Sequence, residues 1–318
     1  MMTNRIAAAL PTAVRASGRR VVRAAAMVTA DLRPFPDLVI IGAKRAGTTS
    51  VFRALEQHRS MCPLVPSARR LPLRENMKGV HYFDSHWTRS TRWYRSHFPT
   101  TFSKALRSRT TGGAFTVEAS PYYLFHPLAA ERAAAVLPDT TQFVAILRDP
   151  VERTVSHWAE QTRNGVETLA LADALDAEAA RLGDADARLA DGTSASSHPH
   201  EQQSFAAQSF YAESLQRWFD AVGRDRVKVL FAEDYYREPA NAINRIVEFI
   251  GAPVIDGGDG VHRNAAERSG ALDDATEARL IELFRADVAA VSELLGVQPP
   301  WARWAHSSSP SAEPMTGR

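Results

Sequence analysis

The sequence has little of several features that define common protein classes. Its 318 residues include one cysteine, Cys62, which excludes an internal disulfide framework and a cysteine-rich metal site. No apolar run approaches the length of a membrane-spanning helix. The net charge of +2 is too small to indicate a nucleic-acid partner. What remains is ordinary globular composition, with 45% hydrophobic residues, which is enough to build a sizeable core.

The two ends of the chain differ in composition from the rest. Residues 1–36 contain several arginines and no acidic residue before Asp31. They lack the uninterrupted apolar core of a secretory signal, so we expect a basic, flexible leader, with contact to a membrane surface as the alternative. Residues 305–318 are rich in serine and proline, and we expect them to be disordered. A cytoplasmic protein, membrane-associated at most through its leader, is the expectation.

Short apolar segments alternate with helical patterns along the rest of the chain. Strands are predicted at Leu38–Ile41, Phe115–Val117, Phe143–Leu147 and Val227–Phe231. Helices are predicted after the first strand, over 128–136 and 211–222, from Pro239 to Gly251, and over 280–295 up to Gly296. This alternation predicts an α/β fold in three layers, a mainly parallel sheet flanked by helices, as in P-loop NTPases. Residues 166–204 do not fit the alternation and are interpreted as an insertion or lid over the site.

The stretch LVIIGAKRAGTTSVF (38–52) has the outline of a phosphate loop but lacks its lysine. Gly42 and Gly47 keep the P-loop spacing, and Thr48 stands where the lysine of G-x-x-x-x-G-K-[ST] would be. A glycine loop that opens a helix still offers N–H groups and a positive dipole end to an anion. The missing lysine argues against a nucleoside triphosphate with Mg²⁺, and cations precede the second glycine instead, as Lys44 and Arg45.

This loop, K/R-x-G-T-T after an apolar strand, resembles the 5′-phosphosulfate loop of sulfotransferases. Those enzymes use 3′-phosphoadenosine 5′-phosphosulfate (PAPS), which carries a phosphosulfate in place of a triphosphate and needs no metal. The resemblance implies that the loop binds the phosphosulfate through a set of neighbouring residues: Lys44, Arg45, Ala46, Gly47, Thr48, Thr49 and Ser50.

A second motif, FVAILRDPVERTVSHW (143–158), joins a buried strand to a helix. Asp149 is predicted to cap this helix, with Pro150 at its first position and Glu152 completing a capping box. Arg148 and Ser156 are placed to hold one phosphate by charge-assisted hydrogen bonds. The pair resembles the sulfotransferase 3′-phosphate motif, including its spacing of eight residues; the alternative is that Arg148 is a surface ion-pair residue.

Further segments resemble the heparan sulfate-type sulfotransferases: 78–99, 117–127, 209–253 and 262–273. The last resembles in position the loop that closes over the nucleotide, which implies that Arg268, Ser269 and Gly270 contact the 3′-phosphate. The resemblance implies a sulfotransferase domain over 37–300.

The general base departs from the family pattern. The heparan-type enzymes have a glutamate just before an HFF-like segment, and here Gly79 fills that place in KGVHYF. His81 is the predicted base because an imidazole accepts a proton near neutral pH; Glu75 and Glu118 are alternatives, and so is a packed, structural histidine. Lys78 is predicted to neutralise the transferring sulfonate. Arg45 is always protonated, so it can stabilise the leaving phosphate without giving up a proton.

Aromatic residues follow the same segments and have two interpretations. They line an acceptor pocket or, for most of them, belong to the core: Trp87, Trp93, Tyr94, Tyr122 and Tyr123.

The sequence therefore predicts a PAPS-dependent sulfotransferase that releases the desulfated product PAP. The acceptor is a hydroxyl, or an amine, of a carbohydrate, lipid or small molecule; no metal and no nucleic acid are expected. Two alternatives stay open: an ATP-dependent P-loop kinase, and a non-catalytic nucleotide- or glycan-binding relative. The second is supported by Gly79, which stands in place of the glutamate that serves as base in the heparan-type enzymes.

Overall fold

The computed structural model describes residues 22–65, 78–254 and 272–304. Its centre is a four-stranded sheet in the order β2-β1-β3-β4, in which every neighbouring pair is parallel. The strands are β1 (Leu38–Gly42), β2 (Val117–Ala119), β3 (Gln142–Leu147) and β4 (Val227–Phe231). The predicted α/β class is confirmed.

The strand predictions hold closely for three strands. β4 has the predicted bounds, and β1 and β3 are each one residue longer than predicted. The second strand was placed two residues early: Phe115 forms an isolated bridge with Met61, and the pairing with β1 begins with Val117 opposite Leu38. An extended apolar residue was therefore mistaken for a ladder residue.

Helices connect the strands and cover both faces of the sheet. Their bounds are α3 (Thr48–Gln57), α4 (Thr91–Arg95), α5 (Thr101–Thr111), α6 (Ala129–Val136), α7 (Pro150–Arg163), α8 (Leu171–Leu182), α9 (Ala185–Ala190), α10 (His198–Gln202), α11 (Ala212–Val222), α12 (Ala232–Arg237), α13 (Pro239–Phe249) and α14 (Asp274–Leu295). Short 3₁₀ turns are η1 (Ala30–Leu32), η2 (Ala207–Ser209), η3 (Arg224–Arg226) and η4 (Ala302–Trp304).

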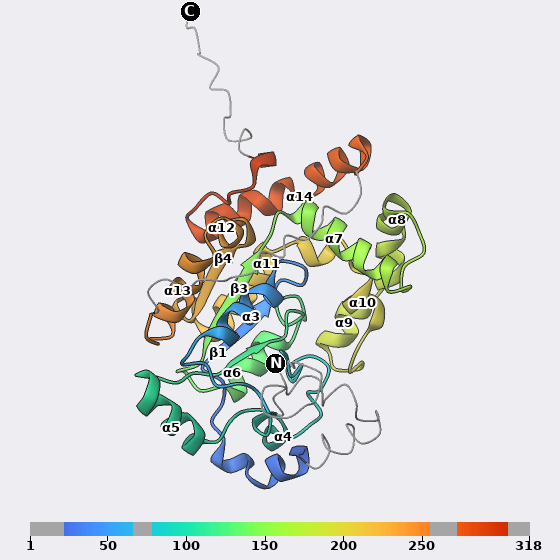
Figure 1. The fold of residues 1–318 in the computed structure, drawn as a ribbon. Helices are drawn as coiled ribbons and strands as arrows, with labels where there is room; N and C mark the ends of the chain where they lie inside the picture. The colour runs from blue at the N-terminus through green and yellow to red at the C-terminus, as the bar shows by residue number, and fades with distance from the viewer. Residues whose placement is uncertain (1–21, 66–77, 255–271, 305–318) are drawn as a thin grey trace, which may run out of the picture.

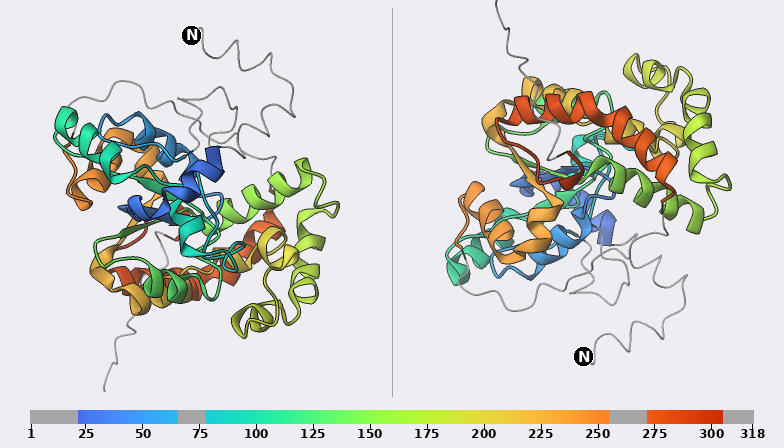
Figure 2. Two further views of the ribbon diagram at one scale, coloured as in Figure 1. Left: turned by 90° about the horizontal axis from the view of Figure 1, so that it is seen from below. Right: turned by 90° about the horizontal axis from the view of Figure 1, so that it is seen from above.

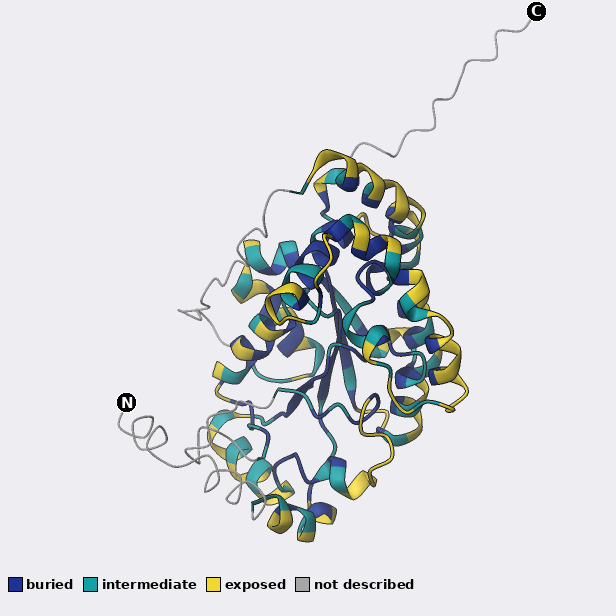
Figure 3. Ribbon diagram, turned by 90° about the vertical axis from the view of Figure 1, so that its right-hand side faces the viewer, coloured by how far each residue is buried: buried dark blue, intermediate teal, exposed yellow. Residues whose placement is uncertain are grey.

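The layers follow from right-handed crossovers between parallel strands. On one face α3 packs on β1 and β2, and α13 packs on α3 and β4; on the other face α11 packs on α6, β4 and α14 (Figures 1 and 2). Figure 3 shows the strands buried at the centre and the exposed residues on the outer faces of the helices. β1 and β3 are buried along almost their whole length, which explains why both read as continuous apolar runs.

The strand order places a ligand site at the carboxyl ends of β1 and β3. The chain leaves β1 for β2 on one side and returns to β3 on the other side. This reversal is a topological switch point, where the loops that follow the two strands lie next to each other. The glycine loop and Arg148 follow β1 and β3 respectively.

The packed body is longer at both ends than predicted. Residues 22–28 are helical, and Ala26 and Ala30 are buried, so the described part of the expected flexible leader is packed. Contacts with α4 hold this segment: Arg92 Nη2 donates to the carbonyl of Met27 at 3.4 Å, and Arg95 Nε donates to the carbonyl of Arg33 at 2.6 Å. At the other end the body continues through η4. Residues 1–21 and 305–318 lie outside the described residues.

Residues 166–204 form a group of their own beside the sheet. Helices α8, α9 and α10 lie together next to α7, at the right of Figure 1. Within the described ranges, no helix is long and apolar enough to cross a membrane.

Candidate functional site

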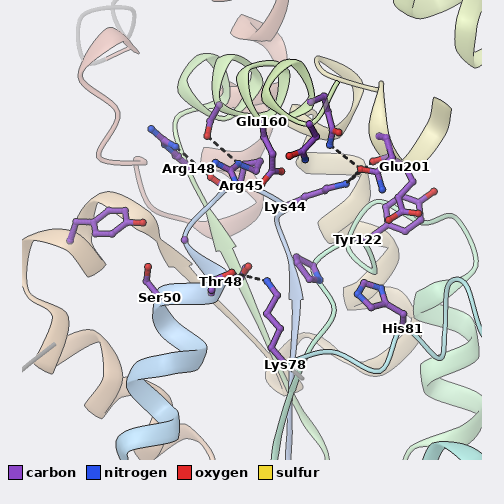
Figure 4. Close-up of a pocket in the computed structure, with 18 residues that line it drawn as sticks. Lys44, Arg45, Thr48, Ser50, Lys78, His81, Tyr122, Arg148, Glu160 and Glu201 are labelled. Carbon is purple, nitrogen blue, oxygen red and sulfur yellow. Dashed lines mark hydrogen bonds and ion pairs between the residues drawn. The ribbon is translucent and has the colours of Figure 1, made fainter. Parts of the chain in front are cut away.

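A cavity of about 610 Å³ opens beyond the carboxyl ends of β1 and β3. Most of the predicted site residues line it (Figure 4): Lys44, Arg45, Gly47, Thr48, Thr49, Ser50, Lys78, His81, Arg148 and Ser156. Ala46 is fully buried and does not line the cavity. Arg268, Ser269, Gly270 and the alternative base Glu75 lie outside the described residues. The described residues contain no group of three or more His, Cys, Asp or Glu side chains that could hold a metal ion.

The glycine loop leaves the start of α3 open to an anion. Gly47 is the N-cap residue in a left-handed conformation, with φ +90°, and no described side chain caps the helix. The positive φ of Gly47 favours glycine here, and a Cβ would also lie 2.8 Å from the Tyr236 hydroxyl, so that side chain would have to shift. The uncapped N–H groups and the hydroxyls of Thr48 and Thr49 therefore form an anion cradle.

Arg45 links the two predicted nucleotide motifs. Its Nε donates to Ser156 Oγ at 3.2 Å, and its Nη1 forms an ion pair with Glu160. The backbone of Arg45 has a φ of 72°, which is uncommon for a residue with a Cβ and typical of functional loops. Glu160 thus holds the cation that the family resemblance assigns to the phosphosulfate.

Arg148 lies between the loop and its own helix. Its Nη1 donates to the carbonyl of Arg45 at 3.4 Å, and its Nη2 pairs with Glu152 at 3.2 Å. Arg148 therefore lines the cavity and is an ion-pair residue at the same time, so the two interpretations drawn from the sequence are not exclusive.

The predicted capping box of α7 is half wrong. Asp149 Oδ1 accepts from the Glu152 N–H at 3.0 Å, as expected. The reciprocal bond is absent: the Asp149 N–H donates to Glu233 Oε1 at 3.0 Å. The physical reason is that the Glu152 carboxylate pairs with Arg148 and with Arg303, at 2.8 Å, and does not turn back to the cap.

The two lysines differ in what they hold. Lys44 Nζ donates to the carbonyl of Glu201 at 3.0 Å and to Gln202 Oε1 at 2.7 Å, so it ties the loop to α10. Burial lowers the pKa of Lys44 to about 8. Lys78 Nζ donates to Thr49 Oγ1 at 2.7 Å, which places it at the anion cradle.

His81 faces the cavity and is held from behind. Its ring Nδ1 lies 2.8 Å from Asp84 Oδ2, and its backbone N–H donates to Ser120 Oγ at 3.0 Å. Burial lowers the pKa of His81, but the hydrogen bond and charge of Asp84 outweigh burial and raise it. With Nδ1 bonded to Asp84, Nε2 of the neutral ring is the nitrogen left to accept a proton.

Glu118, the alternative base, is a structural residue. Its side chain is fully buried and accepts hydrogen bonds from Tyr94, Ser120, Tyr123 and the Val80 N–H. Burial raises its pKa. Because Glu118 does not line the cavity, it has no access to an acceptor there.

The position of the family glutamate cannot hold a side chain in this backbone. A Cβ at Gly79 would lie 2.4 Å from the carbonyl oxygen of Ala119 and 2.6 Å from Ser120 Oγ. Gly79 is thus required by the close approach of its segment to β2.

The aromatic cluster divides between core and cavity. Tyr94 and Tyr123 are fully buried, and Trp87 and Trp93 lie outside the cavity lining. Tyr122 lines the cavity, and its hydroxyl lies 2.6 Å from His200 Nδ1.

Several lining residues escaped the sequence analysis: Pro121, Glu160, Gln161, Asn164, Glu201, Gln202 and Tyr236. Glu160 follows Ser156 by four residues on α7, so helical spacing alone was a usable signal. Tyr236 lies on α12, directly after β4. Ligands of parallel sheets bind beyond the carboxyl ends of the strands, so this position was a second usable signal. Nothing local marks Glu201, because only tertiary packing brings α10 to the cavity.

Comparisons with known proteins agree with this geometry. A family model described as the sulfotransferase family matches residues 36–256. Human bifunctional heparan sulfate N-deacetylase/N-sulfotransferase 1 is 27% identical over 218 residues, which cover 68% of this chain and 22% of the relative. Human heparan sulfate glucosamine 3-O-sulfotransferase 6 is 28% identical over 219 residues, which cover 69% of this chain and 53% of the relative. The chain thus spans about a fifth of the first relative and about half of the second.

A solved structure shares the fold. The sulfotransferase from Alicyclobacillus acidocaldarius superposes with a TM-score of 0.59 at 23% identity, covering 83% of this chain and 96% of that chain.

Proposed function

Because this chain belongs to the sulfotransferase family, we propose that it is an enzyme that transfers the sulfonate of PAPS to a hydroxyl group of a carbohydrate acceptor. The observation that carries this proposal is the single cavity shared by the glycine loop, Arg148 and Ser156, and His81. The curated relatives are named for heparan sulfate, which supports a carbohydrate. An amine acceptor is the second choice, since one of those names specifies N-sulfotransfer.

The donor half of the cavity suits a phosphosulfate better than a triphosphate. The start of α3, with Thr48 and Thr49, would hold the 5′-phosphosulfate, and Lys78 lies against it. Arg148 and Ser156 would hold the 3′-phosphate, which distinguishes PAPS from ATP. When the donor binds, Arg45 would break its ion pair with Glu160 and contact the donor instead.

His81 would act as the base in an in-line transfer. It takes the proton of the acceptor hydroxyl at Nε2 while that oxygen bonds to sulfur and the bond from sulfur to the bridging phosphate oxygen breaks. The electron pair leaves with PAP, and the charges of Arg45 and Lys78 offset the growing negative charge on that oxygen. Asp84 stabilises the imidazolium that forms. The protein otherwise acts by positioning the two substrates.

The first experiment is thermal unfolding with PAP, ADP or ATP, each with and without Mg²⁺. Binding to the folded state adds RT ln(1 + [L]/Kd), about 2.7 kcal/mol at a hundredfold excess over Kd. We expect a clear rise in Tm with PAP that does not depend on metal.

Arg148→Ala supplies the matched control. It removes a proposed 3′-phosphate contact, so the rise in Tm with PAP should shrink toward the smaller rise that we expect with ADP, which lacks that phosphate. A rise that requires ATP and Mg²⁺ would contradict the proposal and favour a P-loop kinase.

A further inference from the structure

The most exposed apolar side chains of the described residues belong to two segments. The four large apolar side chains with the greatest exposed fraction are Val28 (80%), Phe102 (77%), Leu32 (64%) and Leu106 (56%). The first and third lie between the first described helix and β1, and the other two lie on α5. Apolar side chains that gather on a surface mark an interaction site.

The two segments lie side by side. Thr101 Oγ1, at the start of α5, donates to the carbonyl of Leu32 at 3.0 Å. Phe102 and Leu106 are four residues apart, so they lie on the same face of α5. Figure 1 shows α5 and the first described helix together at the lower end of the molecule. We name the surface formed by Val28, Leu32, Phe102 and Leu106 the basal face.

Basic residues surround the basal face. Helices α4 and α5 contain no acidic residue and five basic ones: Arg92, Arg95, Lys104, Arg107 and Arg109. Asp31 pairs with Arg92, and Asp37 pairs with Lys104 at 2.7 Å, so the basic residues outnumber the carboxylates that pair with them. In the sequence, residues 1–21, which directly precede this part of the chain, contain four arginines and no acidic residue.

An anionic lipid surface fits this combination of side chains. Apolar side chains enter the boundary between headgroups and acyl chains, and the basic residues around them are attracted to anionic headgroups. A second copy of this chain fits less well, because pairing two basal faces would bring the same positive charges together.

We propose that the basal face binds the surface of an anionic membrane. The four apolar side chains would enter the lipid, and the basic residues of α4 and α5 would lie against the headgroups. Lys104 pairs with Asp37, the residue before β1, so α5 lies at the amino ends of the strands, whereas the cavity opens beyond their carboxyl ends. The cavity would then face away from the lipid and receive its substrates from solution.

The test is co-sedimentation of the full chain with lipid vesicles. One set contains phosphatidylcholine alone, and the other contains about one third phosphatidylglycerol, which is anionic. We expect at least about tenfold tighter binding to the anionic vesicles, and weaker binding to them as the ionic strength rises.

Two double variants separate insertion from charge. Phe102→Ser with Leu106→Ser removes the apolar side chains of α5 and should weaken binding to the anionic vesicles at least about tenfold. Arg107→Gln with Arg109→Gln should weaken it about fivefold for each charge removed.

The matched control removes two exposed apolar side chains elsewhere. Leu283→Ser with Val297→Ser, on α14 and just after it, should bind the vesicles like the wild type. The rise in Tm with PAP should persist in all three double variants, because none of these residues lines the donor cavity.

Three results would overturn the proposal. The first is no preference for anionic vesicles over neutral ones. The second is wild-type binding by Phe102→Ser with Leu106→Ser, which would assign membrane contact to residues 1–21. The third is a dimer that this variant abolishes, in a protein that binds no vesicles, which would make a second copy the occupant. None of these results bears on PAP binding, so the proposed function is tested separately.

Discussion

His81 derives its chemical character from Asp84, three residues further along the chain. Asp84 is buried, and its Oδ2 lies 2.8 Å from the imidazole Nδ1. Burial disfavours the imidazolium, but the Asp84 carboxylate more than compensates, so the pKa of His81 is raised. A general base must be neutral to accept a proton. The proposed reaction should therefore accelerate as the pH rises through this raised pKa.

His81→Ala should lower kcat by about 10²–10⁴-fold, because general base catalysis typically contributes that much. The rise in Tm with PAP should be unchanged, since His81 contacts no predicted nucleotide residue. The control is His86→Ala, an exposed histidine outside the cavity lining, which should keep wild-type turnover. Wild-type kcat in His81→Ala would remove His81 as the base.

Asp84→Asn tests the same pair through pH. An amide cannot stabilise the imidazolium by charge, so the pKa of His81 should fall and the acidic limb of kcat/KM should move to lower pH. The plateau should also be lower, because a less basic imidazole accepts the proton less readily. Rate profiles between pH 5 and 9 check this; an unmoved acidic limb would show that another group sets it.

At the scale of elements, helices and strands with a strong hydrophobic periodicity or a continuous apolar run were predictable from the sequence, and helices without either were not. The stripes of α11 and α13 and the apolar runs of β1, β3 and β4 matched their predicted positions because burial imposes their pattern. Helix α5 was missed because none of its residues is buried, which leaves no stripe to detect. Helix α4 has only five residues, too few for a period.

The same division applies to the site. The loop at Lys44 and Arg45 and the strand end at Arg148 were predictable, because each is local to one motif. The positions of Glu160 and Glu201 relative to them were not, because they depend on how α7 and α10 pack around the cavity.

Asp149 caps the N-terminus of α7, and burying its carboxylate costs folding free energy. Burial raises the pKa of Asp149 to about 6, despite its bond from the Glu152 N–H and the charge of Arg303. The folded state thus binds this proton more tightly than the unfolded state, whose pKa is about 4. The contribution of Asp149 to the free energy of unfolding therefore falls as the pH rises from about 4 to about 6, and it stays lower above that range.

Asp149→Asn should keep the cap and remove this cost. Asparagine caps helices as well as aspartate, so at pH 8 the free energy of unfolding should rise by up to about 3 kcal/mol. The gain should vanish below about pH 4. Urea unfolding at both pH values measures it.

The matched control is the cap of α14. Asp273 accepts from the Thr276 N–H at 2.9 Å, and that bond lowers its pKa. The pKa of Asp273 is shifted in the opposite direction from that of Asp149. Asp273→Asn should therefore lower the free energy of unfolding at pH 8, and this difference from the wild type should disappear as the pH falls. A loss at pH 8 for both variants would contradict the argument for Asp149.

At the scale of the whole molecule, the last described residues connect three helices. Trp301 and Trp304 are each 2% exposed, and Arg303 pairs with Glu277 on α14 at 2.6 Å and with Glu152 on α7 at 2.8 Å. Trp301 Nε1 donates to Glu233 on α12 at 3.2 Å. The predicted domain end at residue 300 therefore leaves out the packed residues Trp301 to Trp304.

A chain that ends at residue 300 should be less stable than one that ends at residue 304. Loss of a buried tryptophan alone costs about 3–5 kcal/mol, and the pairs of Arg303 are lost as well. Denaturant unfolding of the two shortened chains, against the full chain, measures the difference. Equal midpoints for both would show that 301–304 contribute nothing to the fold.

The contact between Gly79 and β2 has a consequence for any redesign of the site. A glutamate introduced at position 79 would place its Cβ 2.4 Å from the Ala119 carbonyl, so it would cost stability before it could serve as a base. A carboxylate at this position therefore requires a coordinated shift of the β2 backbone, and a single substitution cannot install it.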